Sequence, residues 1–483
     1  MFTMPMLGSP WSGTAAVAFD VLAVAAADEA AIAARQAERL GHLLQAAQAT
    51  RFYGRLLRGV DPGRVALNAL PVTGKAEMMR HWADRVADGQ IRLDALRDFC
   101  ADPDRVAEPF LGRYFVWESS GSTGEPGVFV QDEQAMSVYD ALEALRRNSP
   151  RGLVRWLDPM YLGERFAFVG APGGHFASQV SVRRLRASNP WLAQHSRSFS
   201  IMQPTAELVR ELNDFRPSIV ATYPTAAVLL ADEALRGTLR IRTQELWTGG
   251  ETLSSGMRTR IEQAFGCPLR DSYGASEFLP IAWECGKGRL HVNADWVILE
   301  AVDTERRPLP PGQTSHTTLL TNLANHVQPL IRFDIGDSIS FSGERCACGS
   351  PLPTIQVLGR RDDILVERDA QGTHVSMLPL ALTTLLEDEA GVFDFQLCQQ
   401  AVGRWCLTLG PGVPRRRALR ERCRELLAEF ARRHGAAGLH IITRESDQLP
   451  LGRSGKLKRV VAAAEAVTPP RAAARRRHRN DVD

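Results

Sequence analysis

The spacing of apolar positions predicts helices and strands along most of the chain. Over residues 28–57 apolar residues recur every three or four positions, which predicts one helix. Between residues 113 and 344, short apolar runs alternate with amphipathic segments. The runs predict strands at residues 114–117, 166–169, 218–221, 246–248, 297–302 and 317–321, and the amphipathic segments predict helices at 205–215 and 225–236. This alternation is typical of βαβ units and of a largely parallel sheet.

The pattern changes after Gly359. Strands are predicted at residues 364–367, 395–399, 404–409 and 439–443, and helices at 378–388 and 415–434. We therefore expect an α/β protein with a large N-terminal domain of mixed or parallel sheets and helices, residues 1–358. A small, mobile α+β C-terminal domain, residues 359–465, follows it. Residues 466–483 contain two prolines and then several arginines, which predicts a disordered basic tail.

Composition narrows the class of protein. Of 483 residues, 44% are apolar and 23% are charged, which is typical of a globular protein. The longest apolar stretch, residues 15–27, is interrupted by Asp20 and is shorter than the roughly 20 residues of a transmembrane helix. It also lacks the charged start of a signal peptide. The eight cysteines follow no disulfide-scaffold pattern, so we expect reduced thiols and a cytoplasmic protein.

The formal net charge of +3 argues against a dedicated nucleic-acid-binding protein. Residues 466–483 contain five arginines and two aspartates, so the tail carries the whole excess. The remaining chain is neutral, and a basic pocket for an acidic substrate stays compatible with it. Weak contact of the tail with a membrane surface, an acidic protein or nucleic acid is left open.

A Ser/Gly-rich segment is the first candidate for chemistry. Directly after a predicted strand, residues 118–127 read ESSGSTGEPG. Glycines allow close approach of the backbone, and hydroxyls with backbone N–H groups can surround phosphate oxygens. No Gly-Lys-Ser/Thr follows, so the segment is not a Walker loop. Taken alone, it fits a surface turn equally well.

Five further motifs follow in order: WTGGE (247–251), DSYGASE (271–277), IRFDIGD (331–337), GRRDD (359–363) and LPLGRSGKLKR (449–459). In this order and spacing, the set resembles the adenylate-forming ligase superfamily, the acyl-CoA synthetases and their relatives. Within it the chain looks most like the phenylacetate–CoA ligase branch. The branch-like features are TRFY (50–53), LPVTGK (70–75), FRP (215–217) and CACG (346–349). The resemblance covers residues 30–460.

The resemblance implies that a carboxylic acid attacks the α-phosphate of ATP and that pyrophosphate leaves. Such a site must bring like charges together with hydrogen-bond donors, a cation and a metal ion. The loop residues that would hold the β- and γ-phosphates are Ser119, Ser120, Gly121, Ser122, Thr123 and Gly124. Relatives often have lysine where this chain has Glu125, which leaves one phosphate contact open. Tyr273, followed by Gly274, would stack on adenine opposite the backbone of Gly249, Gly250 and Glu251.

The same resemblance assigns roles to charged residues. Glu277 would bind Mg²⁺, because a hard cation prefers carboxylate and phosphate oxygens. Asp337 would accept hydrogen bonds from the ribose, and Arg360 would add a cation beside ribose and phosphate. Lys456 would reach in from the small domain and stabilise charge in the transition state. Asp362 matches the hinge on which the small domain turns; for each residue a solvated surface position is the alternative.

The acid is expected to lie near residues 170–176 and the two adenine-facing motifs. The expected wall residues are Phe168, His175, Phe176, Tyr223, Trp247, Ala275 and Phe278. An aromatic, compact wall favours a flat aryl acid such as a hydroxybenzoate or phenylacetate over a long acyl chain. Each of these residues taken alone also fits core packing.

The acceptor of the acyl group is left open between CoA and the phosphopantetheine of an acyl-carrier protein, as in natural-product pathways. Two other hypotheses remain: an amine acceptor that gives an amide, and a non-catalytic ligase-like binding protein. No specific nucleic acid and no transmembrane segment are expected, and a homodimer is left open.

Cys285, His291, Cys346 and Cys348 form a Cys₃His set of the type that holds structural zinc. Some members of the branch that the chain resembles hold a structural metal at such residues. The alternative is reduced thiols packed in turns, with His291 capping a strand. Cys267, Cys398, Cys406 and Cys423 lie among apolar neighbours and are expected to fill the core.

Overall fold

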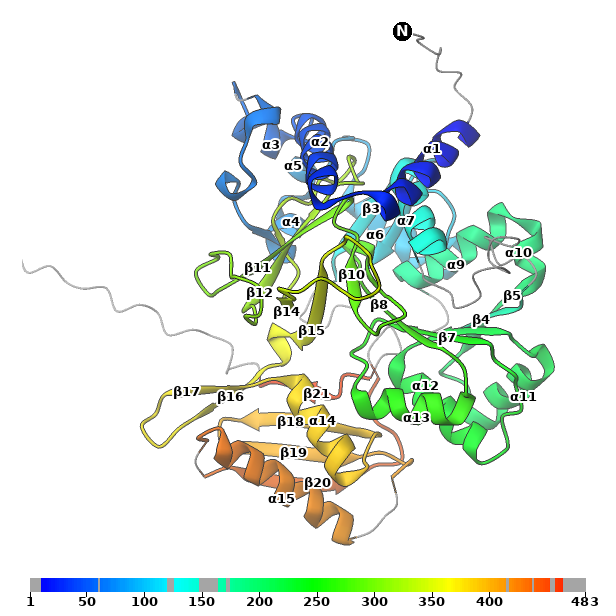
Figure 1. Cartoon of the computed structure of the whole chain (residues 1–483), viewed down its shortest axis with the longest axis vertical. Coiled ribbons are helices and arrows are strands. Elements are labelled where there is room, and N and C mark those ends of the chain that lie inside the picture. Colours follow the sequence, from blue (N-terminus) through cyan, green and yellow to red (C-terminus); the bar gives the residue numbers. More distant parts are fainter. Residues whose placement is uncertain are drawn as a thin grey trace, which may run out of the picture.

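The computed structural model describes residues 10–59, 61–119, 126–146, 164–170, 174–413, 417–436, 438–451 and 457–463. These residues form a large N-terminal domain and a smaller C-terminal domain, each with its own hydrophobic core (Figure 1). The α/β fold with a small α+β domain is as predicted. The predicted basic tail, residues 466–483, lies outside the described residues.

A nine-stranded sheet runs through the large domain, in the order β14-β15-β10-β9-β8-β7-β6-β4-β5 among the described residues. The strands β5, β4, β6, β7 and β8 are parallel, whereas β9, β10, β15 and β14 are added antiparallel. The expectation of a largely parallel sheet was therefore only half right. The direction reverses at a two-residue hairpin between β8 and β9, and such a short connection allows only antiparallel pairing. The bounds are β4 Phe166–Gly170, β5 Ser196–Ser200, β6 Ile219–Thr222, β7 Glu245–Gly249, β8 Leu269–Ala275, β9 Phe278–Glu284, β10 Leu290–Val292, β14 Asp337–Phe341 and β15 Thr354–Arg360.

Three helices pack against the parallel half of this sheet and form one hydrophobic core with it. They are α11 Thr205–Phe215, α12 Pro224–Leu235 and α13 Ser255–Phe265, and the predicted helix at 205–215 is confirmed to the residue. Because alternate strand residues point to opposite faces, Phe168, Ala221 and Trp247 lie in register across β4, β6 and β7 on the other face. Two further helices, α9 Ala177–Ser188 and α10 Pro190–His195, lie between β4 and β5 in the chain.

The N-terminal helices differ from the prediction. Residues 28–57 form two helices, α2 Glu29–Ala47 and α3 Arg51–Leu56, because Thr50 caps α3 by accepting a hydrogen bond from Tyr53 N at 3.2 Å. The rest of this part consists of the four-stranded sheet β1-β13-β12-β11, the hairpin β2–β3 and several helices. Their bounds are α1 Pro10–Ala23, β1 Thr73–Gly74, α4 Lys75–Arg80, α5 Trp82–Arg85, α6 Leu93–Ala101, β2 Phe115–Glu118, β3 Val128–Gln131, α7 Glu133–Arg146, β11 Val297–Val302, β12 Thr317–Asn322 and β13 Phe333–Asp334.

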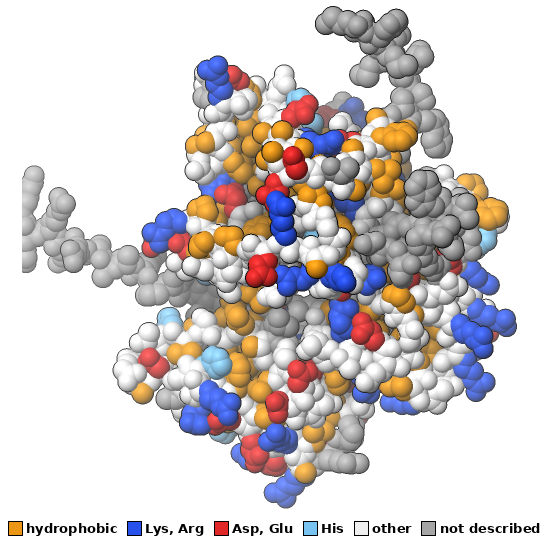
Figure 2. Space-filling model, in the orientation of Figure 1, with side chains coloured by type: hydrophobic (Ala, Val, Ile, Leu, Met, Phe, Trp, Pro, Cys, Tyr) orange, Lys and Arg blue, Asp and Glu red, His pale blue; other side chains and the backbone are white. Residues whose placement is uncertain are grey.

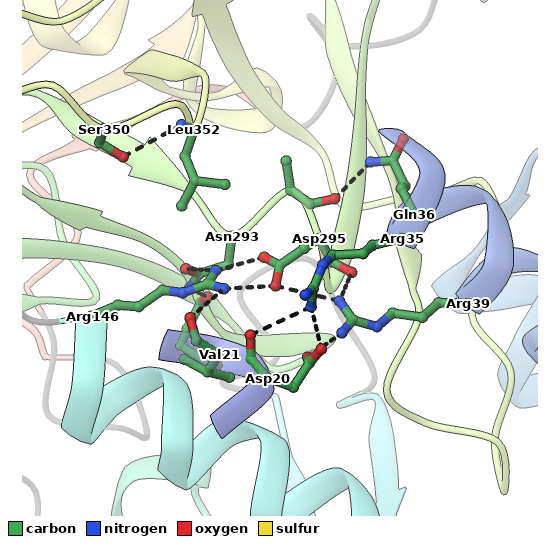
Figure 3. Close-up of polar contacts among 12 residues, drawn as sticks. Asp20, Val21, Arg35, Gln36, Arg39, Arg146, Asn293, Asp295, Ser350 and Leu352 are labelled. Carbon is green, nitrogen blue, oxygen red and sulfur yellow. Dashed lines mark hydrogen bonds and ion pairs between the residues drawn. The ribbon is translucent and has the colours of Figure 1, made fainter. Parts of the chain in front are cut away.

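A largely buried ion-pair cluster connects α1 and α2 to the rest of the large domain (Figure 3). Arg146 binds Asp295 through both terminal nitrogens, at 2.5 and 2.6 Å, and the Asp295 side chain is fully buried. Arg39 reaches Asp295 at 3.3 Å, and Asp20 of α1 pairs with both Arg35 and Arg39. Since an unpaired buried charge is costly, this cluster fixes how α1 and α2 sit on the domain.

The small domain is built on the sheet β20-β19-β18-β21, covered by two helices. A hairpin, β16–β17, precedes it. The predicted strands and helices of this part are confirmed within about three residues, the usual uncertainty of element ends. The bounds are β16 Leu365–Arg368, β17 His374–Met377, α14 Pro379–Ala390, β18 Phe395–Ala401, β19 Arg404–Leu409, α15 Arg417–Arg433, β20 His440–Glu445 and β21 Val460–Val461.

The surface carries charges of both signs. On the face shown in Figure 2, Lys and Arg side chains are interspersed with Asp and Glu side chains, in agreement with a small net charge. Within the described residues, we find no helix with the length and apolar content needed to cross a membrane.

Candidate functional site

Four of the predicted site residues meet where β8, β14 and β15 lie close together. Tyr273 on β8 donates a hydrogen bond from its hydroxyl to Asp337 Oδ2 at 2.6 Å. Asp337 opens β14 and pairs with Arg360 at the end of β15, whose Nε lies 3.9 Å from Asp337 Oδ1. Glu277 lies in the β8–β9 hairpin turn, where its backbone carbonyl accepts a hydrogen bond from Asn322 Nδ2 at 2.8 Å. Three separate sequence motifs thus supply one polar cluster.

The glycines of these motifs are required by close backbone contacts. A Cβ on Gly274 would lie 1.9 Å from the carbonyl oxygen of Leu279, which no side chain tolerates. A Cβ on Gly249 would lie 2.7 Å from Ser272 Oγ, and Gly250 has a φ of +77°. Gly249 and Gly274 are therefore required by close packing of neighbouring strand segments, and the stacking of a flat base beside Tyr273 stays a prediction.

Desolvation dominates the electrostatics of the cluster. It raises the pKa of Glu277 from 4.5 to about 7, although the positive charges of Arg360 and Lys75 oppose this rise. It also raises the pKa of the Tyr273 hydroxyl well above 10, with the charge and hydrogen bond of Asp337 adding to the effect. A carboxyl group whose charged form is disfavoured by burial gains from a bound cation, so the donor chemistry of Glu277 suits Mg²⁺.

The neck of the predicted phosphate loop is closed by two hydrogen bonds. Ser119 N donates to the carbonyl of Gly127 and Gly127 N donates to Ser119 Oγ, both at 2.8 Å. Ser120, Gly121, Ser122, Thr123 and Gly124 lie outside the described residues.

Lys75, to which sequence reasoning assigned no role, lies beside this neck. A Cβ on Gly127 would lie 3.1 Å from Lys75 Cδ, so the lysine stem packs against Gly127 at the neck. Its charge also acts on Glu277. The sequence carries one signal for it, the rarity of lysine: of the 58 basic residues, the lysines are Lys75, Lys287, Lys456 and Lys458.

Two predicted residues of the small domain have little or no description. Lys456 lies outside the described residues, and for Asp362 only the backbone is described, in the short helical turn Arg361–Asp363. The neighbour of Lys456, Leu457, is described: its backbone N–H donates to Glu251 Oε1 at 3.2 Å. The Glu251 side chain thus contacts the segment that carries Lys456, a contact that the sequence did not predict.

The expected acid-pocket residues do not form one continuous wall. Phe168, Trp247 and Ala275 lie on β4, β7 and β8 of the same sheet, with β6 between β4 and β7. Tyr223 and Phe176 occupy the N-cap positions of α12 and α9. Phe278 is fully buried and packs edge-on against Tyr139, with ring centroids 4.9 Å apart. His175 is also buried, and its Nε2 lies 3.1 Å from the carbonyl of Asp102. In this arrangement Phe278 and His175 belong to the core and offer no surface to an acid.

The Cys₃His set comes together as the spacing predicts. The four ligand atoms of Cys285, His291, Cys346 and Cys348 all lie within 4.8 Å of one another. Cys285 Sγ and Cys346 Sγ are 3.7 Å apart, and Cys348 Sγ is 3.3 Å from His291 Nε2. A tetrahedral site with Zn–S bonds of about 2.3 Å would separate its sulfurs by roughly 3.8 Å, so the set fits zinc.

The surroundings of His291 favour a metal ligand. Its Nδ1 lies 2.9 Å from the carbonyl oxygen of Leu352, a partner that leaves Nε2 free to bind a metal. Desolvation lowers the pKa of His291, which keeps the imidazole neutral, the form that binds a metal. The set joins the turn after β9 to the turn after β14, so zinc here would be structural.

We predict that Cys348→Ser lowers the zinc content and the unfolding temperature. The unfolding temperature should fall by more than about 2–4 °C, the shift that accompanies a loss of about 1 kcal/mol in the free energy of unfolding. Metal analysis and thermal unfolding check this, with Cys267→Ser as the control outside the set. A zinc-free preparation with the same unfolding temperature as the zinc-bound one would rule out a structural metal.

Comparison with known proteins gives the chain relatives along nearly its whole length. No family model matches it. A phenylacetate–coenzyme A ligase of Thermus thermophilus is 26% identical over 468 residues, which cover 89% of this chain and 96% of that protein. The structure of a 2-hydroxyisobutyryl-CoA ligase in the postadenylation state matches with a TM-score of 0.64, at 20% identity and 89% coverage of both chains. The same ligase in the thioesterification state matches with a TM-score of 0.52, at 20% identity and 88% coverage of both.

Proposed function

Since the chain belongs to the adenylate-forming ligase superfamily, as an AMP-forming acid–thiol ligase of the phenylacetate–CoA ligase-like branch, we propose that it activates an aromatic carboxylic acid and passes the acyl group to a thiol. The observation that carries the proposal is the meeting of Tyr273, Asp337, Arg360 and Glu277 in one cluster. These side chains come from motifs up to 87 residues apart in the chain, between Tyr273 and Arg360.

In the first half-reaction the chain's residues hold ATP and offset its charge. The carboxylate of Asp337, oriented by the Tyr273 hydroxyl, accepts hydrogen bonds from the ribose. Tyr273 and the backbone of Gly249 and Gly250 enclose the adenine. Glu277 would hold Mg²⁺, which would supply positive charge to offset that of the phosphates, and Arg360 and Lys456 stabilise the charge that builds at the α-phosphate.

Aromatic side chains on one face of the parallel strands support an aromatic acid as the substrate. Two aromatic side chains of the parallel strands, Phe166 and Trp247, contact each other with ring centroids 5.5 Å apart. Phe168 shares their face of the sheet. With His175 and Phe278 in the core and Phe168 and Tyr223 also buried, the partly exposed Phe166, Trp247 and Phe176 are the aromatic side chains proposed to contact a flat ring.

For the acceptor we propose CoA, with an acyl-carrier protein as the alternative, because both deliver the same phosphopantetheine thiol. Incubation with ATP, an aryl acid and either CoA or a phosphopantetheinylated carrier protein separates them. The mass of the thioester identifies the acceptor. If neither thiol is acylated although the adenylate forms, the proposed second half-reaction is wrong.

We predict that Lys75→Met weakens ATP binding about tenfold or more but leaves AMP binding unchanged. The reason is that a charged hydrogen bond contributes about 1.5–3 kcal/mol and that Lys75 lies at the phosphate loop rather than at the base or ribose. Isothermal titration with ATP and with AMP checks this. Arg80→Met, on the exposed side of the same helix, is the control. Equal weakening of both nucleotides would mean a structural role instead.

A further inference from the structure

A carboxylate of the large domain fixes the start of the segment that follows Lys456. Glu251 Oε1 accepts the backbone N–H of Leu457 at 3.2 Å. Its other oxygen accepts from Thr225 N at 3.1 Å and from Thr225 Oγ1 at 2.8 Å, at the beginning of α12. Glu251 thus bridges the nucleotide-facing edge of the large domain and the residue next to Lys456.

A carboxylate of the small domain makes the matching contact from the other side. Glu387 on α14 is fully buried, where it forms an ion pair with Arg459 and accepts the hydroxyl of Ser254. Ser254 belongs to the large domain and also caps α13, since its Oγ accepts Met257 N at 3.2 Å. One hydroxyl can donate to Glu387 and accept from Met257 at the same time.

Gly256 allows the two domains to approach at this point. A Cβ on Gly256, in the first turn of α13, would lie 2.8 Å from Asp388 Oδ1 and 3.4 Å from Phe393 Cε1, both of the small domain. Phe393 packs against the core of the large domain, and Arg260 lies 5.3 Å from its ring centroid. Glycine weakens a helix, so its presence here fits the contact rather than the helix.

Lys458 and Arg459, which follow Leu457 in the chain, each make contacts of their own. Lys458 Nζ pairs with Asp363 at 2.5 Å, and the Lys458 carbonyl accepts Gln396 Nε2 at 2.9 Å. The Arg459 carbonyl accepts Leu397 N at 2.7 Å, and β21 then pairs with β18. The path of the chain on the C-terminal side of Lys456 is therefore fixed by both domains.

We propose that Glu251 and Glu387 are positioning residues that lock the small domain in the pose that brings Lys456 to the nucleotide. This rests on the proposed function. The interdomain lock consists of Glu251, Ser254, Gly256, Glu387 and Arg459. The lock serves the adenylation half-reaction only, and its two hydrogen bonds between domains, Ser254–Glu387 and Glu251–Leu457, must break for the small domain to turn.

The test places a negative charge at Gly256. Gly256→Asp places a carboxylate against the carboxylate of Asp388, beside Glu387 Cβ, and like charges at an interface oppose its formation. Ser255→Asp is the matched control, because it adds the same charge to the same helix turn at an exposed position. Acidic residues in the first turn of a helix are favourable at both positions, so the fold of the large domain is retained.

Three readouts are compared in Gly256→Asp and Ser255→Asp. Acid-dependent pyrophosphate exchange should fall about tenfold or more only in Gly256→Asp. Thioester formation from a synthetic acyl-adenylate should stay within about twofold of wild type, and tryptic cleavage after Lys458 and Arg459 should accelerate as these residues leave the interface. Equal losses in both half-reactions, or the same exchange and cleavage rates in both variants, would overturn the lock. If no acid supports exchange in the wild type, that result counts against the proposed function. The cleavage rates of the two variants still test the proposed lock in that case.

A second variant tests the contact of Glu251. Glu251→Ala should lower the exchange rate at saturating ATP about tenfold, and its affinity for AMP should match that of wild type, because the carboxylate contacts Thr225 and Leu457. Weaker AMP binding with an unchanged maximal rate would instead make Glu251 a nucleotide ligand and contradict its positioning role.

Discussion

Lys456→Ala should reduce acid-dependent pyrophosphate exchange by about a hundred- to a thousandfold while the protein keeps its unfolding temperature. A donor aimed at charge that develops in the transition state commonly contributes a factor of this size. The contacts of Leu457, Lys458 and Arg459 all involve neighbours of Lys456, so they remain when its side chain is removed. Substrate affinity should change much less than the rate.

The control for Lys456→Ala is Lys287→Ala, which removes an exposed lysine. It should exchange pyrophosphate at the wild-type rate. A near-normal rate in Lys456→Ala would remove Lys456 from the adenylation mechanism. A lower unfolding temperature in the same variant would give it a structural role.

Glu277→Gln should reduce adenylation about a hundredfold and abolish most of its response to Mg²⁺. Glutamine keeps the shape of the side chain but loses the charge that a hard cation prefers. The measurement is the exchange rate as a function of Mg²⁺ concentration, with the exposed Glu305→Gln as the control. Wild-type dependence on Mg²⁺ in Glu277→Gln would place the metal elsewhere.

The pKa of Glu277 also predicts a pH dependence. Burial raises it from 4.5 to about 7, so between these values the folded state binds a proton that the unfolded state has released. The contribution of Glu277 to stability therefore falls as the pH rises through this window, whereas Mg²⁺ affinity rises up to about pH 7. Glu277→Gln should show a shallower fall in stability. Part of the slope should remain, because burial raises the pKa of Asp271 to about 7 as well.

Local patterns were sufficient to predict the helix at 205–215 and six elements of the small domain, because each has an uninterrupted period. The short strands β17 and β21 were not predicted. They failed where tertiary contacts decide. The helix predicted at 28–57 breaks at Thr50, whose side chain caps the next helix. β9 was missed, because its residues are buried by cross-strand neighbours and show no strict alternation.

Motif order was sufficient to bring together Tyr273, Asp337, Arg360 and Glu277, and spacing was sufficient for the Cys₃His set. Sequence could not separate wall residues from core residues. Phe278 and His175 are aromatic and follow the right motifs, but their rings turn towards Tyr139 and Phe99. The contacts Glu251–Leu457 and Glu387–Ser254 could not be predicted from the sequence either, because they join residues 206 and 133 positions apart.

The most direct test of the account is pyrophosphate exchange by the full-length chain with ATP, Mg²⁺ and a panel of carboxylic acids. The panel should pair each aryl acid, such as a hydroxybenzoate or phenylacetate, with an aliphatic acid of similar size. We predict exchange that requires an acid and is fastest with an aryl acid. Exchange confined to aliphatic acids would contradict the aromatic substrate, and no exchange with any acid would contradict adenylate formation itself.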